Sequence, residues 1–324
     1  MPQLYDVTIV GAGPVGMFAA YYAGFRKLTA KIIDSLDEVG GQVTALYPDK
    51  NIYDVAGFPG ILGKDLVKNL YQQMEHHEPT LALGQQAREL TRTPEGHWLI
   101  RSDQEEHLTR TMIISSGIGV FTPRMFGKPE VDGYEGRGLS FSMQQPDQYS
   151  GKRVLIVGGG DSAVDWANHL APLADQVYVA HRRDQFRAHE ASVEQMRRHV
   201  EVIAPAQVKS IRGDARVEEV VLRCGADEPD RTLSVDAVLA FLGFHSDAGP
   251  LADWGLDLVK NQIPINQQCE TNLPGIYAAG DCAYFPGKAK LIAVGFGEAA
   301  TAINNLAVYI DPSKSVFPGH SSNV

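Results

Sequence analysis

Two glycine-rich segments carry the residue types and the spacing that bind a phosphate group. The first reads GAGPVG at residues 11–16, and the second reads GGGDSA at residues 158–163. Each follows a short apolar run and opens an alanine-rich segment of helical character. Backbone N–H groups and the positive end of a helix dipole reach a pyrophosphate only where no side chain blocks the turn, which requires glycine. Two such segments in strand–loop–helix context predict two dinucleotide sites, and hence electron transfer between two dinucleotides.

Several positions in these segments are candidates for dinucleotide binding. In the first segment they are Gly11, Gly13, Pro14 and Gly16. In the second segment they are Gly158, Gly160, Asp161 and Ser162. The competing interpretation is a glycine-rich turn that binds nothing, and the strand–loop–helix context of both segments disfavours it.

The residue that ends the second strand of each unit distinguishes the two sites. The predicted strand at residues 30–33 ends at Asp34, 18 positions after Gly16 (34 − 16). A carboxylate there accepts hydrogen bonds from ribose hydroxyl groups and repels a 2′-phosphate. The first site is therefore suited to FAD or NAD.

The corresponding strand of the second unit, residues 176–180, runs into a basic segment instead. The candidate residues of this segment are His181, Arg182, Arg183 and Arg187. Guanidinium groups pair bidentately with phosphate oxygens, so the segment is suited to the 2′-phosphate of NADPH. The alternative is a solvated basic face, which the position at the ribose end of the site disfavours.

Composition limits the remaining possibilities. A chain of 324 residues that is 44% hydrophobic and 21% charged has core enough for two domains. A net charge of −10 disfavours nucleic acid as a partner, and no apolar run approaches the length of a membrane span. A strand that begins close to residue 5 is expected to leave no room for a signal peptide. The cysteines Cys224, Cys269 and Cys282 lack metal-ligand spacing, so we expect no metal site and a reducing, cytoplasmic setting.

The order of the elements predicts how the two dinucleotide domains are connected. Residues 112–117 and 236–243 are apolar strands that end at a glycine and close the first and second units. Residues 275–281 then supply a further strand that ends in an acid, followed by a helix at residues 297–306. The second unit is therefore inserted into the first.

The predicted fold is α/β, with two Rossmann-like dinucleotide-binding domains. The FAD-binding domain is discontinuous, at residues 1–117 and 246–324, and the NADPH-binding domain is residues 118–245. The crossings near Phe121–Pro123 and Phe244–Ser246 are a natural hinge. We also expect a small β meander at residues 89–111 and a frayed tail from Pro312 onward.

The chain resembles the thioredoxin reductase branch of the two-dinucleotide flavoproteins over nearly its whole length. The resemblance rests on both glycine segments, on Gly40-Gly41-Gln42, on HRRDQFRA at residues 181–188 and on AAGD at residues 278–281. Thioredoxin reductases carry a CxxC just before the second glycine segment, whereas residues 138–147 contain no cysteine here. A disulfide relay at this position is excluded, because exchange requires a thiolate. The chain is thus similar to the thioredoxin-reductase-like ferredoxin/flavodoxin–NADP⁺ reductases, which carry a C-terminal extension.

This resemblance implies further contacts to FAD. Asp34 would bind the adenosine ribose, Ala87 the adenine side and Asp281 the ribityl chain. Gly41, Gln42 and Tyr47 would lie by the isoalloxazine, with Tyr47 stacked on one face. Phe121 would lie near the flavin at the crossing, Ser322 would contact the flavin, and His320 would cover its opposite face. A helix beginning near Phe296–Glu298 would point its positive end at the N1–C2=O edge of the flavin.

Each of these side chains has a structural alternative. Tyr47 and Phe121 are also typical core aromatics, Asp281 is also a typical helix cap, and His320 lies in a segment typical of a disordered tail.

The function implied is electron transfer between NADPH and a one-electron carrier, ferredoxin or flavodoxin, through FAD. Hydride transfer to the flavin N5 needs no side-chain acid or base, so we name no catalytic residue. The resemblance also implies a homodimer. The alternatives are an NADPH diaphorase or oxidase that reduces quinone, oxygen or another small protein, and a non-catalytic flavin- or NADPH-sensing protein. The sequence does not fix the carrier, the direction of flux, the redox potential, or whether the tail covers its own or the partner subunit's flavin.

Overall fold

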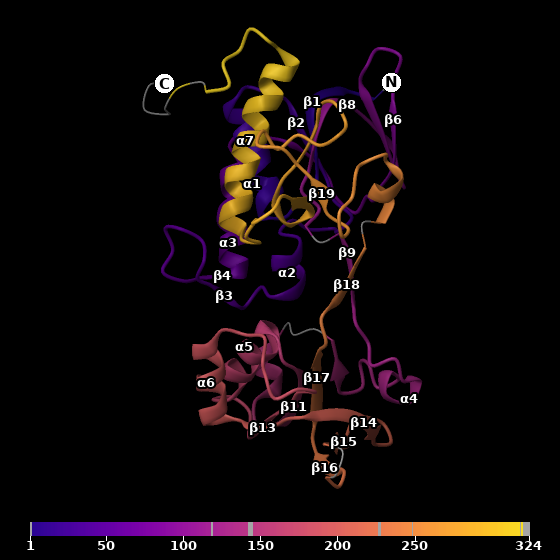
Figure 1. Cartoon of the computed structure of the whole chain (residues 1–324), viewed down its shortest axis with the longest axis vertical. Helices are drawn as coiled ribbons and strands as arrows, with labels where there is room; N and C mark the ends of the chain where they lie inside the picture. Colours follow the sequence, from indigo (N-terminus) through magenta and orange to yellow (C-terminus); the bar gives the residue numbers. More distant parts are fainter. Residues whose placement is uncertain are drawn as a thin grey trace. The chain divides into compact units, whose positions relative to one another are not determined.

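The computed structural model describes residues 2–117, 119–141, 145–225, 228–247, 249–317 and 319, with only the backbone described at 120–123 and 244–247. The chain divides into two compact units (Figure 1). Unit 1 comprises Met1–Val120 and Ser246–Val324, and unit 2 comprises Phe121–His245. Unit 2 starts three residues later than the boundary expected at residue 118 (121 − 118) and ends at the expected residue 245.

A parallel sheet forms the centre of unit 1. Its strands are β1 (Leu4–Val10), β2 (Ala30–Ile33), β5 (Thr80–Ala82), β8 (Glu106–Ile114) and β20 (Ile276–Ala278). β1 pairs with β2 on one side and β8 on the other, β5 flanks β2, and β20 pairs with the end of β8. Ile9, Ile32 and Ile113 are fully buried in this sheet, as expected where both faces of a parallel sheet are covered.

Three long helices pack on unit 1. They are α1 (Pro14–Phe25), α3 (Gly63–Glu75) and α7 (Ile292–Ile310), and α1 packs against both of the others. The small buried residues Ala19, Ala20 and Ala23 allow α1 to lie close to its neighbours. A short helix, α2 (Gln42–Leu46), precedes the small hairpin of β3 (Asn51–Ile52) and β4 (Ile61–Leu62).

The expected start of the last helix is wrong. α7 begins at Ile292, four residues before Phe296 (296 − 292). Glycine is a poor helix former, so Gly295 and Gly297 made a later start the natural expectation. Position 295 needs a glycine because a Cβ there would lie only 2.4 Å from Cγ2 of Val15 in α1.

An antiparallel meander extends the sheet of unit 1, as the sequence predicts. It consists of β6 (Ala87–Arg92) and β7 (Trp98–Ser102), with β7 paired to the first half of β8. Trp98 is buried together with Trp254, which follows the 3₁₀ helix Gly249–Asp253. The remaining strands of unit 1 are β19 (Ile263–Pro264) and β21 (Ala283–Tyr284).

Unit 2 has its own parallel sheet. The strand order is β10 (Leu139–Ser140), β17 (Ala237–Phe241), β11 (Arg153–Gly158), β12 (Gln176–Ala180) and β13 (Glu201–Ile203). The helices α5 (Asp161–Leu170) and α6 (Glu190–His199) pack over one core, and the antiparallel strands β14 (Ala206–Arg212), β15 (Glu219–Cys224) and β16 (Arg231–Ser234) share the other. α4 (Pro129–Asp132) packs near β14.

The two crossings between the units lie side by side. β9 (Val120–Pro123) pairs with β18 (Phe244–Asp247) in a two-stranded ribbon. In the part of the chain that the structure describes, no helix is both long and apolar enough to cross a membrane.

Candidate functional site

In the first glycine segment, two glycines are in close contact with neighbouring backbone, and a third borders open space. A Cβ at Gly11 would lie 2.5 Å from the carbonyl oxygen of Ser115, and one at Gly16 would lie 1.9 Å from the carbonyl oxygen of Gly11. Both glycines are therefore required for α1 to dock on the strand ends. A Cβ at Gly13 would meet no atom within 4 Å. Gly13 precedes Pro14 at the start of α1, and no side chain caps this helix end, so its N–H groups remain available to an anion.

Asp34 lies at the end of β2 with its carboxylate directed at the glycine segment. Its Oδ2 accepts the N–H of Ala12 at 2.5 Å, and its Oδ1 accepts the N–H of Leu36 at 2.8 Å. Burial raises the pKa of Asp34, and these backbone hydrogen bonds oppose that rise. A carboxylate has about four acceptor sites, so this one can still accept a hydrogen bond from a ribose hydroxyl group.

Four parallel strands bring distant segments to one edge of the sheet. β1, β2, β8 and β20 all point the same way, so their carboxyl ends meet at this edge. The N–H of Gly11 bonds Ile33, the N–H of Ser115 bonds Val10, and the N–H of Ala279 bonds Ile114, at 2.8–3.0 Å. In doubly wound sheets, ligands bind outside such an edge. The buried hydroxyl of Ser116 here has no hydrogen-bond partner among the described residues.

The GGQ segment lies over the first glycine segment. The N–H of Gly40 bonds the carbonyl oxygen of Ala12 at 2.8 Å, and a Cβ at Gly41 would lie 3.2 Å from Cα of Gly13. Gln42 opens α2, and its Nε2 would lie 2.6 Å from a Cβ at Gly117, beyond the end of β8. Gly41 and Gln42 thus lie beside the edge formed by the strand ends.

Tyr47 follows α2 and shares the surroundings of Asp281. Burial, and then the charges of Asp281 and Asp54, raise the pKa of Tyr47 to about 12. The phenol is therefore neutral at physiological pH. Asp281 lies in the short 3₁₀ helix Gly280–Cys282, which follows β20.

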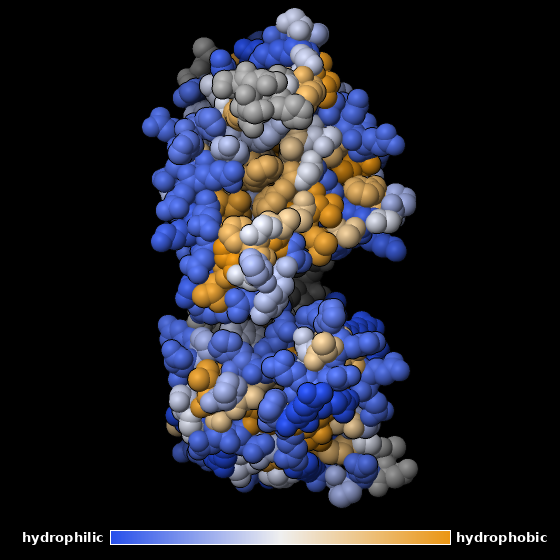
Figure 2. Space-filling model, turned by 90° about the vertical axis from the view of Figure 1, so that its left-hand side faces the viewer, coloured by the Kyte–Doolittle hydropathy of each residue, from blue (hydrophilic) through white to orange (hydrophobic). Residues whose placement is uncertain are grey.

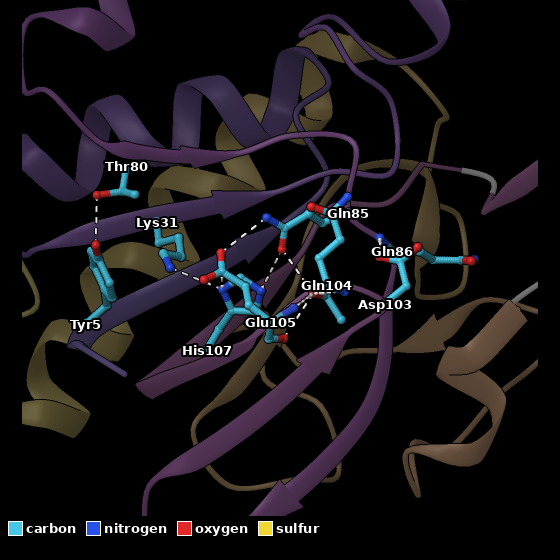
Figure 3. A network of polar contacts seen from close by, with 10 residues as sticks. Tyr5, Lys31, Thr80, Gln85, Gln86, Asp103, Gln104, Glu105 and His107 are labelled. Atoms are coloured by element: carbon cyan, nitrogen blue, oxygen red, sulfur yellow. Dashed lines mark hydrogen bonds and ion pairs between the residues drawn. The ribbon is translucent and has the colours of Figure 1, made fainter. Parts of the chain in front are cut away.

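Ala87 opens β6, next to a buried polar network that the sequence did not reveal (Figure 3). Nζ of Lys31 lies 3.1 Å from Nδ1 of His107, and Nε2 of His107 lies 3.1 Å from Oε1 of Gln85. Burial, and then the charge of Lys31, lower the pKa of His107, so its ring is neutral and donates to Gln85. The N–H of Gln85 bonds the carbonyl oxygen of Asp34 at 2.9 Å, which ties the turn before Ala87 to the end of β2.

Three predicted contacts fall where the structure gives no side chain. Phe121 lies in β9, whose backbone alone is described. His320 and Ser322 lie outside the described residues. The chain leading to them is held by Arg26, whose guanidinium donates to the carbonyl oxygens of Ser315 at 2.9 Å and Val316 at 3.0 Å.

The second glycine segment, like the first, has one glycine in close contact with backbone and one that borders open space. A Cβ at Gly158 would lie 2.5 Å from the carbonyl oxygen of Phe241, whereas one at Gly160 would meet no atom within 4 Å. α5 begins at Asp161, directly followed by Ser162, and no side chain caps its first turn. An open, uncapped helix end lies at the carboxyl end of β11, as in unit 1.

The basic segment after β12 folds back onto this glycine segment. The ring of His181 packs so closely on Gly159 that a Cβ there would lie 2.4 Å from it. The N–H of Arg187 bonds the carbonyl oxygen of Gly159 at 2.6 Å. Burial lowers the pKa of His181, and the neighbouring arginine charges add to this, against a hydrogen bond with the backbone of Gln185.

The guanidinium groups of the basic segment are accessible. Arg182, Arg183 and Arg187 are exposed, and within the described part of the chain none of them forms an ion pair with a carboxylate. Guanidinium groups that are fixed to a glycine segment through the backbone but are free of carboxylates suit an anionic ligand.

The thiols are buried and unpaired. Cys224, Cys269 and Cys282 are free. Burial raises the pKa of Cys269 to about 12 and that of Cys282 to about 11, so both are protonated at neutral pH. The Sγ of Cys282 lies 3.2 Å from the carbonyl oxygen of Ile114. Thiols of this kind cannot act as exchange nucleophiles.

We expect the native protein to react slowly with thiol reagents at pH 7, because the thiolate is the reactive form and none of the three sulfurs is accessible. Titration with an aromatic disulfide reagent should show at most a small rapid phase in buffer and the full set of three thiols in denaturant. Rapid stoichiometric labelling of the folded protein would contradict this interpretation.

Comparison with known proteins agrees with this geometry. The family model described as pyridine nucleotide-disulphide oxidoreductase matches residues 5–305. The ferredoxin–NADP reductase of Halalkalibacterium halodurans is 47% identical, over 99% of this chain and 98% of that protein. The ferredoxin–NADP reductase of Geobacillus thermodenitrificans is 46% identical with the same coverage.

Solved structures show the same fold. The thioredoxin reductase of T. acidophilum superposes with a TM-score of 0.82 at 25% identity, covering 96% of this chain and all (100%) of that chain. These findings confirm the α/β fold with two Rossmann-like domains and the resemblance that the motifs predicted. The chain therefore belongs to the pyridine nucleotide-disulphide oxidoreductase family, and within it to the ferredoxin–NADP reductases of the thioredoxin-reductase-like type.

Proposed function

We propose that this protein passes electrons between NADPH and a one-electron carrier, ferredoxin or flavodoxin, through FAD and without a redox disulfide. One observation carries the proposal: two open, uncapped helix ends follow two glycine segments, one beside a carboxylate and the other beside free guanidinium groups. The relatives named ferredoxin–NADP reductase support the choice of reaction. The buried, unpaired thiols support electron exit without a disulfide and a reducing, cytoplasmic setting.

Unit 1 fits FAD. A side chain at Gly13 would fill the space that a pyrophosphate needs, and the orphaned hydroxyl of Ser116 offers a further polar contact. Asp34 would bind the adenosine ribose, and Tyr47, as a neutral phenol, would stack on the ring system. The other residues proposed to hold FAD are Gly11, Pro14, Gly16, Gly41, Gln42, Ala87, Phe121, Asp281, His320 and Ser322.

Unit 2 fits NADPH. The N-terminal end of α5 would bind the pyrophosphate through residues 158–162, because its first N–H groups have no side-chain cap. Arg182 and Arg183 would bind the 2′-phosphate, with Arg187 and the neutral ring of His181 alongside. Bound FAD supplies the ability to accept a hydride and to release electrons singly. The side chains bind and orient the two cofactors, and none of them is required to move a proton.

The test is anaerobic reduction of the purified flavoprotein by NADPH, followed by addition of candidate carriers. We expect the released flavin to chromatograph as FAD, and bleaching by NADPH to be reversed by ferredoxin or flavodoxin. Comparison of kcat/KM for ferredoxin, flavodoxin and quinone distinguishes a carrier reductase from a diaphorase. Reduction of quinone or oxygen with no reduction of either carrier would overturn the proposal, and bound flavin that NADPH cannot bleach would favour a sensing protein.

We propose that the protein is a homodimer that associates through unit 1. Figure 2 shows apolar side chains gathered in a band over this unit, on the side where α7 lies in Figure 1. The half-buried ring of Phe18 in α1 contacts Phe296 of α7 at a centroid distance of 5.1 Å, and Tyr309 near the end of α7 is 44% exposed. Continuous apolar surface of this kind marks protein interfaces.

Sedimentation velocity at micromolar concentration is therefore expected to give a species of 70.6 kDa (2 × 35.3 kDa). The physical reason is that a second copy would remove the apolar band from water. A single species of 35.3 kDa at that concentration would show that the band has another use.

Removal of the tail from Gly319 onward is expected to leave FAD bound, since the glycine segment and Asp34 are untouched. The flavin absorption band should be altered. The rate of carrier reduction or of oxygen consumption should change by about two- to tenfold, because an aromatic stacking contact contributes roughly 0.5–1.5 kcal/mol. Arg26 still holds Ser315 and Val316 in this variant, so the effect reports on the removed residues alone. Identical spectra, kcat and oxygen consumption would remove His320 and Ser322 from the proposed site.

A further inference from the structure

A buried ion pair lies behind the turn that carries Asp281. Nζ of Lys288 lies 2.7 Å from both carboxylate oxygens of Glu298, and the two side chains are only 5% and 8% exposed. Lys288 belongs to the loop before α7, and Glu298 lies in the second turn of that helix. Neither residue has a place in the cofactor contacts proposed above.

Both members of the pair hydrogen-bond to the backbone of one residue, Gly280. Oε2 of Glu298 accepts the N–H of Gly280 at 2.7 Å, and Nζ of Lys288 donates to its carbonyl oxygen at 2.6 Å. Gly280 has a φ of +79°, a left-handed conformation that favours glycine. The pair therefore fixes the residue immediately before Asp281 through its donor and its acceptor together.

The backbone at Gly280 is closely packed. A Cβ at Gly280 would lie 3.3 Å from Val15, in the first glycine segment, and one at Gly295 would lie 3.2 Å from Cα of Gly280. The turn after β20, the helix α7 and the start of α1 thus meet at one point. A shift at Gly280 would move the carboxylate of Asp281 relative to the glycine segment.

Stability alone is a poor reason for a pair like this one. Two charges lose their hydration on burial, and apolar side chains of similar volume often stabilise a core as well or better. What apolar side chains cannot do is hydrogen-bond a peptide N–H and a carbonyl oxygen at once. We infer that Lys288 and Glu298 are positioning residues, which fix the peptide of Gly280 and thereby hold Asp281 where it binds the cofactor of unit 1. This inference rests on the proposed function.

The experiment measures FAD affinity of the deflavinated full chain, by quenching of flavin fluorescence. Glu298→Gln and Lys288→Met each leave the other charge buried without its partner, and we expect each to raise the Kd for FAD about tenfold or more. The double variant Lys288→Met/Glu298→Gln is expected to raise the Kd by less than the product of the two single effects. The visible circular dichroism of bound flavin should change in the same variants.

A second cycle tests whether the pair acts through Asp281. In the background of Asp281→Asn, adding Glu298→Gln is expected to raise the Kd by much less than it does in the wild type. Leu306→Ala is the matched control, because Leu306 is fully buried in the same helix two turns further on. We expect this control to lower the melting temperature of the apoprotein and to leave the Kd unchanged.

Three results would overturn the inference. In the first, both pair variants melt at lower temperature and bind FAD with an unchanged Kd, like the control. In the second, the effects of Glu298→Gln and Asp281→Asn multiply fully. If these variants do not fold, Lys288→Arg keeps the charge but changes the donor geometry, and an unchanged Kd in that variant is the third. Failure of the wild-type apoprotein to bind FAD is a different outcome, which would remove the proposed cofactor and the inference with it.

Discussion

Replacement of Arg182 and Arg183 together by alanine is expected to lower kcat/KM for NADPH by on the order of 10²-fold, with NADH affected by less than about threefold. Each charge-assisted hydrogen bond to a phosphate contributes roughly 1.5–3 kcal/mol, and the lower end applies to exposed side chains. NADH lacks the 2′-phosphate, so it gains little from these residues. The preference of the wild type for NADPH should also shrink as salt is added, because ions screen exposed charges.

The control for this prediction removes the same charge elsewhere in unit 2. Arg212 at the end of β14 and Arg216 in the turn after it are exposed. They lie at the opposite end of this strand from Ala206, whose N–H bonds the carbonyl oxygen of His181 at 2.7 Å. Their double alanine variant should leave the ratio of the two kcat/KM values unchanged. An equal loss with NADPH and NADH in the Arg182/Arg183 variant would place these arginines outside the 2′-phosphate site.

Gly13→Ala and Gly16→Ala are expected to impair different properties, FAD affinity in the first case and stability in the second. A methyl group at Gly16 would lie 1.9 Å from the carbonyl oxygen of Gly11, so α1 has to move and the apoprotein should lose roughly 1–3 kcal/mol of unfolding free energy or more. Gly13 has a φ of −69° and nothing within 4 Å of its added Cβ, so Gly13→Ala should change that free energy by no more than about 0.5 kcal/mol. The methyl group would instead occupy the space of the pyrophosphate, and FAD affinity should fall about 10²-fold or more, because the N–H donors of α1 lose their partner.

Urea denaturation of the apoproteins and titration with FAD measure the two effects separately. Gly160→Ala provides the same comparison in unit 2, where the added Cβ also meets no atom within 4 Å. It should weaken NADPH binding and leave both FAD binding and stability intact. FAD binding by Gly13→Ala with wild-type affinity would show that the pyrophosphate does not pass over this residue.

Many of the strands, glycine segments and helices that form both sites could be predicted, because short stretches of sequence indicate them. Each glycine segment follows an apolar strand and precedes a helix, and the structure has β1 and α1, then β11 and α5, at those places. The strand predicted at residues 176–180 has those bounds, and Asp34 lies directly after β2 with its carboxylate on the glycine segment. Because the strands pair in parallel, their carboxyl ends then lie at the same edge of the sheet.

The remaining features could not be predicted because their partners are distant or because they break local rules. Lys31 lies in a buried strand and meets His107 only after β2 and β8 are placed in one unit. Lysine and glutamate are residue types that usually lie on the surface. Nothing in the local sequence shows that Lys288 and Glu298 both hydrogen-bond to the backbone of Gly280. Gly295 lies inside α7 and packs so closely on Val15, 280 residues away (295 − 15), that only a folded structure reveals why a glycine stands in this helix.

The insertion of one unit into the other also determines the order in which the chain can fold during its synthesis. Unit 2 is a single continuous stretch, Phe121–His245, so it is complete as soon as that stretch has left the ribosome. Unit 1 still lacks β20 and α7 at that moment, and one side of the end of β8 stays unpaired until Ile276–Ala278 has been made. In newly made chains, unit 2 should therefore become resistant to proteases before unit 1 does. They can retain flavin only after the last helix has been translated and packed against α1.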